Sequence, residues 1–173
     1  MPEPSLPPPI PTEREKYPEP PSPRLLAADF HSLSFPLLAP RNSHSNTCKP
    51  AEHFEPGQSY PNVFHAHASL YVLGDYYLID SLKALALYKL HRALCIFQLD
   101  GENVRDIVDL ARCAYSEEGK GFEEGISESR GLVCQYMAAN TAVLCLDTWF
   151  VDLLREGGQF VIDFFKFASQ RIH

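Results

Sequence analysis

The stretch HASLYVLGDYYLIDSLKALALYKL, from His67 to Leu90, decides the fold class of this chain. It is largely apolar but carries charged side chains, among them Asp75, Asp80 and Lys83, so it is too charged to cross a membrane. Its apolar residues recur at spacings of three and four, which is the helical period, and it is too long for one buried strand. Gly74 with Asp75 ends or bends a first helix, over 63–74. The stretch therefore predicts two closely paired helices.

The same period continues to the end of the chain. Asp80 is the expected N-cap of the second helix and Asp100 that of the third, in which Asp106 and Asp109 are expected to face water. The remaining signals are an interruption at Asn140, a cap at Asp147 and a stop at Gly157-Gly158. The sequence predicts an all-α bundle of about six helices, over residues 63–74, 81–98, 102–115, 128–146, 148–156 and 159–171.

Composition divides the chain near residue 62. All 15 prolines lie at or before Pro61, and apolar residues make up 18 of the first 62 positions against 60 of the last 111. A segment so poor in apolar residues cannot offset the entropy lost on ordering. We therefore expect a Pro-rich, largely disordered arm over 1–62 and a helical domain over 63–173.

Two parts of the arm have alternative roles. The tracts PPPIP and PEPPSPR within residues 1–24 favour polyproline II, either as a solvated tail or as a PxxP ligand flanked by Arg24. Residues 25–40, LLAADFHSLSFPLLAP, are apolar and cut by Pro36 and Pro40. We expect them to form a short helical turn that docks on the domain.

The net charge of the chain limits the classes of partner that we expect. The net charge is −7, of which −2 precedes residue 63. An acidic chain without a Lys/Arg cluster in its helical half is not expected to bind nucleic acid or an anionic membrane surface. The opening MPEPSLPPPIP is not a signal peptide, and we expect an intracellular protein, cytoplasmic or nuclear.

The five cysteines form neither a CxxC motif nor an even-numbered framework, which fits a reducing compartment. Four of them lie in apolar helical stretches and are expected to be small core residues rather than nucleophiles. They are Cys95, Cys113, Cys134 and Cys145.

Other candidate chemistry is weak. His65 and His67 stand two residues apart, which places them on different sides of a helix, so a metal pair is not expected. His91 is flanked by basic residues and is expected on an exposed face. The acidic Gly-containing loop 116–127 is expected to be a solvated linker, and Phe167 the most exposed aromatic residue of the last helix. We expect no catalytic residue, no cofactor and no metal, hence no enzyme.

The opening stretch resembles the closing helix pair of BTB/POZ domains, in the form common among fungal BTB proteins. The matching features are His67-Ala68, Tyr71-Val72-Leu73, Asp75-Tyr76, Ile79, Leu82-Lys83 and Leu85-Ala86. The segments ENVRDIVDLARCAYSEEG, RGLVCQYMAAN and LLREGGQFVIDFF resemble the helical extension of the same proteins. The resemblance covers roughly residues 63–173, and Gly74 departs from it where such proteins usually have Ala.

The front of a BTB domain, a small sheet and three helices, has no counterpart in residues 1–62. The first two helices therefore carry more apolar surface than a six-helix bundle needs, to be covered by residues 25–40, by a second chain or by nothing. We expect an interaction surface on this helix pair. Its candidate residues are Tyr71, Leu78, Leu82, Leu85 and Tyr88.

The resemblance implies a protein–protein interaction module. BTB proteins dimerise, and several are adaptors for cullin-3-type ubiquitin ligases, while others are transcription-related scaffolds. The expected partners are therefore proteins: a second copy of the chain, or a cullin-3-type ligase scaffold. The alternatives are a truncated BTB remnant without adaptor activity and an enzyme dependent on a metal or a cysteine.

Overall fold

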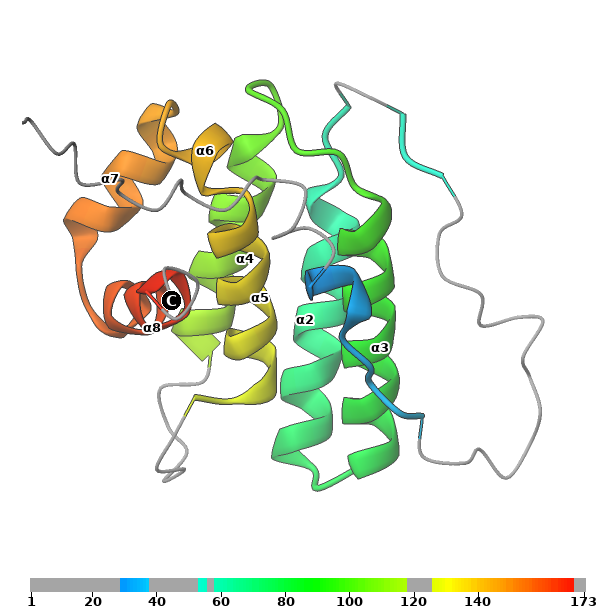
Figure 1. The fold of residues 1–173 in the computed structure, drawn as a ribbon. Coiled ribbons are helices and arrows are strands. Elements are labelled where there is room, and N and C mark those ends of the chain that lie inside the picture. The colour runs from blue at the N-terminus through cyan, green and yellow to red at the C-terminus, as the bar shows by residue number, and fades with distance from the viewer. Residues whose placement is uncertain (1–28, 38–52, 56–57, 118–125, 170–173) are drawn as a thin grey trace, which may run out of the picture.

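The computed structural model describes residues 29–37, 53–55, 58–117 and 126–169, which contain helices and no strand. In Figure 1 the helices over 61–76 and 80–96 stand side by side on one flank, those over 104–117 and 128–139 form the middle, and those over 148–156 and 159–169 cover the other flank. The predicted all-α fold is confirmed. The helices are α2 (Pro61–Tyr76), α3 (Asp80–Ile96), α4 (Val104–Glu117), α5 (Glu128–Ala139), α6 (Thr141–Leu144), α7 (Thr148–Glu156) and α8 (Gln159–Ser169).

One core joins all the longer helices. α2 packs on α3 and α4, α4 packs on α5 and α7, and α5 packs on α8. Two residues from before position 63, Phe30 and Phe54, are buried in the same core. The largest fully buried side chains include Phe64, Leu90, Leu94, Ile107, Leu110, Leu132, Met137, Leu144 and Phe150.

In the first helix pair, the end of α2 and the start of α3 both differ from the prediction. α2 begins at Pro61, whose fixed φ suits the first turn of a helix, and it runs through Gly74 to Tyr76. Gly74 therefore does not end it. Asp80 is the first residue of α3 rather than its N-cap, which is Ile79 without a capping side chain. The expectation of an Asp80 cap is wrong.

Asp106 also departs from expectation. It was expected to face water, but it is only 3% exposed. Its carboxylate accepts hydrogen bonds from the Ser59 hydroxyl at 2.7 Å and from the Tyr60 backbone N–H at 2.5 Å. Because Tyr60 is the N-cap of α2, these bonds fasten the start of α2 to the first turn of α4. Helical periodicity places Asp106 opposite the core, and only a distant segment explains its burial.

In the second half of the chain, the observed helix boundaries agree with the predicted signals. Asn140 separates α5 from α6, and the Asp147 carboxylate caps α7 by accepting from the Trp149 N–H at 2.7 Å. Gly157 and Gly158 follow α7 with φ of 73° and 79°, a region that favours glycine. All three predictions are confirmed.

The ends of α4 and α8 require smaller corrections. Asp100 caps the turn before α4, since its carboxylate accepts from the N–H groups of Glu102 and Asn103 at 2.9 and 3.2 Å. On α8, Phe165 is 57% exposed and Phe167 is half-buried, so the predicted exposure of Phe167 is wrong. The predicted acidic loop lies mostly at 118–125, outside the described residues.

The arm docks as predicted in the part that the structure describes. Residues 29–32 are helical, residues 33–37 have no regular secondary structure, and Phe30 is 3% exposed. Figure 1 shows this segment, in blue, crossing the first helix pair. It covers His91, which is 4% exposed, so the expectation of a solvated His91 is wrong. The Pro-rich tracts and Arg24 lie outside the described residues.

Candidate functional site

Among the described residues, the end of α2 and the turn that leads to α3 carry the largest group of neighbouring exposed apolar side chains, which we call the apolar tip. It lies at the bottom of the view in Figure 1. Their exposed fractions range from 39% at Leu70 to 86% at Leu78. Side chains of this kind gather in cores or at interfaces. The apolar tip consists of Leu70, Leu73, Tyr76, Tyr77, Leu78 and Ile79.

The backbone of the apolar tip forms a Schellman motif. The N–H of Leu78 donates to the carbonyl of Asp75 at 3.1 Å, and the N–H of Ile79 donates to the carbonyl of Gly74 at 2.7 Å. The left-handed position of this motif is usually glycine. Here it is Leu78, with φ of 55°, the only described non-glycine residue with positive φ. A leucine in this region costs about 1–2 kcal/mol, so the chain accepts strain to display an apolar side chain.

Gly74 lets the two helices meet below this turn. A Cβ there would lie 2.9 Å from the backbone nitrogen of Lys83 and 3.3 Å from the carbonyl oxygen of Ile79. Contacts this short with backbone atoms cannot be relieved by rotating a side chain. Gly74 is therefore required by the close approach of α2 to the first turn of α3.

An ion pair closes the turn from the side. Lys83 Nζ lies 2.5 Å from Asp75 Oδ1 and 5.4 Å from the centre of the Tyr71 ring. The side chains of Lys83 and Asp75 are 22% and 52% exposed, so the pair itself contributes little to stability. It neutralises one of the two carboxylates between residues 70 and 83, which leaves the apolar tip with little charge.

The predicted interaction residues occupy different environments. Leu78 is the most exposed, at 86%, and lies in the apolar tip. Tyr71 is 4% exposed and belongs to the core. Leu82, Leu85 and Tyr88 are half-buried on α3. Sequence reasoning did not select Tyr76 and Tyr77, whose rings meet edge to face at 5.0 Å. Their signal was the four-residue apolar run YYLI between two aspartates.

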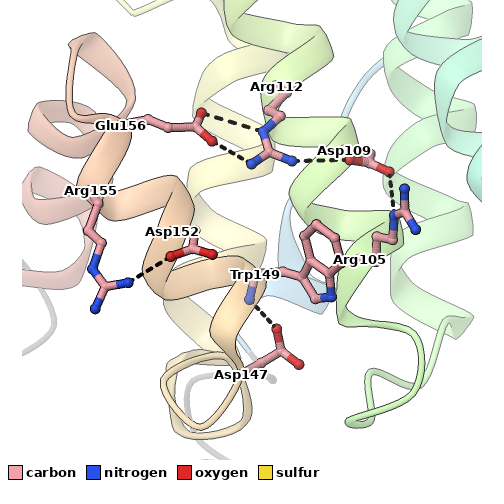
Figure 2. Close-up of polar contacts among 8 residues, drawn as sticks. All are labelled: Arg105, Asp109, Arg112, Asp147, Trp149, Asp152, Arg155 and Glu156. Carbon is pink, nitrogen blue, oxygen red and sulfur yellow. Dashed lines mark hydrogen bonds and ion pairs between the residues drawn. The ribbon is translucent and has the colours of Figure 1, made fainter.

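A second surface, between α4 and α7, is charged (Figure 2). Arg112 meets Glu156 through two nitrogens, at 2.5 Å for Nη2 and 3.4 Å for Nε, and reaches Asp109 at 3.4 Å. Arg105 approaches Asp109 at 3.6 Å. The Glu156 hydrogen bond raises the pKa of Arg112. These charges neutralise one another and tie α7 to α4.

Trp149 extends the same surface. Its ring lies 4.8 Å from the Arg105 guanidinium carbon, a cation–π contact, and its residue is 44% exposed. Asp152 and Arg155 pair on the outer side of α7 at 2.8 Å, as Figure 2 shows. The charged side chains in Figure 2 have partners within this surface. We therefore interpret the surface as a structural contact between α4 and α7 rather than a ligand site.

A polar cluster around the buried Cys134 and Asp163 joins α4, α5 and α8. The Tyr115 hydroxyl donates to Asp163 at 3.0 Å and lies 3.2 Å from the Cys134 sulfur. Gln159 donates to the other Asp163 oxygen at 2.8 Å. Burial raises the pKa of Cys134 to about 12 and also raises the pKa of Tyr115. A thiol this reluctant to ionise is a poor nucleophile, so the cluster is interpreted as a connection between helices.

The remaining cysteines and histidines do not converge on a site. Cys134 is buried as predicted, Cys95 and Cys113 are half-buried, and Cys145 is exposed, which corrects the expectation of four core thiols. His67 is half-buried, and its pKa is lowered by burial and by Lys89. Over the described ranges, no group of three or more His, Cys, Asp or Glu side chains is placed to hold a metal ion.

Comparisons of the whole chain with protein families, curated proteins and solved structures find no match. Among the described helices, none is both long and apolar enough to cross a membrane. The apolar tip therefore stands as the candidate functional site on its geometry alone.

Proposed function

We propose that this chain is a protein–protein interaction module that associates through the apolar tip. The observation that carries this proposal is Leu78, which is 86% exposed at a left-handed backbone position where glycine would be less strained. Strained positions that persist in a fold are typical of functional sites. Tyr76 and Tyr77, at 79% and 62% exposure, supply the aromatic surface that interfaces favour.

The partner that we propose is a second copy of the chain. The chain has a net charge of −7, so two copies repel each other over most approaches. At the apolar tip the Asp75 carboxylate is neutralised by Lys83, and Asp80 is the only other acid between residues 70 and 83. Two apolar tips can therefore meet around a two-fold axis with little like-charge repulsion.

A finer proposal rests on the BTB resemblance of residues 63–173. In this proposal the dimer is an adaptor for a cullin-3-type ubiquitin ligase, or a transcription-related scaffold, with α2 and α3 as the closing helix pair of the domain. The alternative is a remnant that folds and carries no adaptor activity. Titration with purified cullin-3 tests the adaptor, since saturable binding supports it and the absence of binding leaves the scaffold or the remnant.

The experiment that tests self-association is size-exclusion chromatography with light scattering on the full chain. Leu78→Asn removes the apolar side chain with little added strain, because asparagine tolerates the left-handed region. We expect a wild-type dimer whose dissociation constant rises about tenfold or more in this variant, the loss expected for one buried leucine. Leu146→Asn is the matched control, since Leu146 is 88% exposed and lies outside the apolar tip.

Two results would overturn the proposal. One is a wild-type chain that remains monomeric at the highest concentration that can be reached. The other is a dimer that Leu146→Asn weakens as much as Leu78→Asn does, because the association would then not depend on the apolar tip.

A further inference from the structure

We propose that the face of α3 and α5 beneath the docked arm is a binding site for partner peptides with two phenylalanines separated by four residues. The chain's own segment from Phe30 to Phe35 occupies this site as an internal competitor. We call it the arm site and define it by His91, Cys95 and Tyr136. This inference is independent of association through the apolar tip.

The first support is the way in which aromatic rings make the contact. The Phe30 ring lies 5.1 Å from the His91 ring and 5.3 Å from the Tyr136 ring, centre to centre. The Phe35 ring lies 5.1 Å from the same imidazole. His91 therefore contacts both phenylalanines, and Phe30 reaches from α3 to α5. Ring pairs at these distances add specific stabilisation to the apolar burial.

The second support is a polar contact that does not depend on side-chain identity. His91 is 4% exposed, and its Nε2 lies 3.0 Å from the backbone carbonyl oxygen of Phe30. The Cys95 sulfur lies 3.3 Å from the same nitrogen. Every peptide has such a carbonyl, so any segment that places two phenylalanines correctly can supply this contact. Of the four residues between the phenylalanines, Leu33 is half-buried and packs against the core, whereas His31, Ser32 and Ser34 are exposed and can vary.

The third support is the length of chain that connects the docked segment to the domain. Fifteen residues, 38–52, connect Leu37 to His53. Fully extended, they span up to about 50 Å. The docked segment also becomes shallower along its length, because Phe30 is 3% exposed, Phe35 is half-buried and Leu37 is 46% exposed. Such a tethered segment competes with free ligands at an effective concentration of the order of millimolar.

The experiment uses a fluorescein-labelled peptide with the sequence of residues 25–40, titrated with full-length chains and followed by anisotropy. In the variant Phe30→Ala/Phe35→Ala the chain's own arm no longer competes. We expect this variant to bind the peptide with 1:1 stoichiometry and about tenfold or more tightly than wild type. Ser32→Ala/Leu37→Ala, which changes exposed arm positions, should bind like wild type. A peptide in which His31, Ser32 and Ser34 are scrambled around an unchanged Leu33 should still bind, and one with both phenylalanines replaced by alanine should not.

Equal affinity of the wild-type and double-phenylalanine chains would overturn the proposal, as would binding that persists without the peptide's phenylalanines. If the double variant lacks a cooperative unfolding transition, a wild-type chain with a protease site inserted between residues 38 and 52 replaces it. Cutting this chain removes the tether's advantage. Peptide affinity should then rise and the arm fragment should be displaced, whereas unchanged affinity after cutting would refute an exchangeable site.

Discussion

The Nε2 of His91 lies 3.0 Å from the carbonyl oxygen of Phe30, although 61 residues separate the two along the chain. This contact buries an imidazole between two segments whose contact could not be predicted from the sequence pattern. Burial lowers the pKa of His91, and the neighbouring charges of Arg92 and His31 act in the same direction, while the hydrogen bond to Phe30 opposes them. The net shift is downward.

This shift predicts lower stability in mild acid. Between the folded-state pKa and the unfolded value of about 6.5, the unfolded chain binds more protons, so the free energy of unfolding falls as the pH falls. We expect the wild type to be less stable at pH 5.5 than at pH 7.5. His91→Gln replaces the imidazole donor with an amide donor that does not titrate. This variant should therefore lose less stability than wild type between pH 7.5 and pH 5.5. His67→Gln measures the parallel contribution of His67, whose pKa is also lowered. Identical pH slopes in wild type and His91→Gln, measured by urea unfolding, would contradict this prediction.

Leu78→Gly should make the protein more stable and less able to associate. Glycine removes the strain of the left-handed position, a gain of about 1 kcal/mol after allowing for its greater freedom in the unfolded chain. It also removes the most exposed side chain of the apolar tip. Urea unfolding of the monomer measures the first effect and light scattering the second. A destabilised Leu78→Gly variant would show that Leu78 packs within its own chain.

Gly74→Ala should destabilise the domain, even though alanine is the better helix former. The added Cβ would lie 2.9 Å from the backbone nitrogen of Lys83, so α2 and α3 would have to separate. Overpacking of this kind costs about 1–3 kcal/mol, measurable by urea unfolding. Gly101→Ala is the control because its Cβ would meet nothing within 4 Å. A variant as stable as wild type would show that the helices can shift without penalty.

Asp106→Ala should be among the more costly substitutions of an aspartate. It leaves the Tyr60 N–H and the Ser59 hydroxyl without their acceptor, a loss of about 1–3 kcal/mol. Asp152→Ala removes an exposed partner of Arg155 and should change stability by less than about 1 kcal/mol. Thermal or urea unfolding of the two variants gives the comparison. Equal losses would mean that Asp106 does not anchor the start of α2.

The helices themselves were predictable because their signals are local. Asn140, Asp147 and the glycine pair act within a turn or two of their own positions, and the structure places them as predicted. Asp80 shows the limit of this reasoning. α3 begins at Asp80 itself, with Ile79 as its N-cap and no capping side chain, directly after a turn in which Leu78 adopts a conformation that composition does not reveal.

The errors about the burial of Asp106 and His91 share one physical cause. Asp106 and His91 were assigned to water because each lies on a polar side of its helix. Distant segments cover them: Ser59 and Tyr60 reach Asp106, and Phe30 reaches His91. Periodicity within a helix cannot show which residues from distant parts of the chain pack against it. The candidate site was predicted in part, since Leu78 was selected from the sequence while Tyr76 and Tyr77 were not.

Trp149 is the only tryptophan of the chain, and its ring rests on the Arg105 guanidinium between α7 and α4. Intrinsic indole fluorescence therefore samples one junction of the bundle and no other. Detachment of α7 changes the surroundings of the indole, whereas departure of the arm from His91 or pairing of two apolar tips takes place elsewhere. The protein thus carries an optical probe that is specific for its last helices, and any emission change during arm exchange would reveal coupling between the two ends of the molecule.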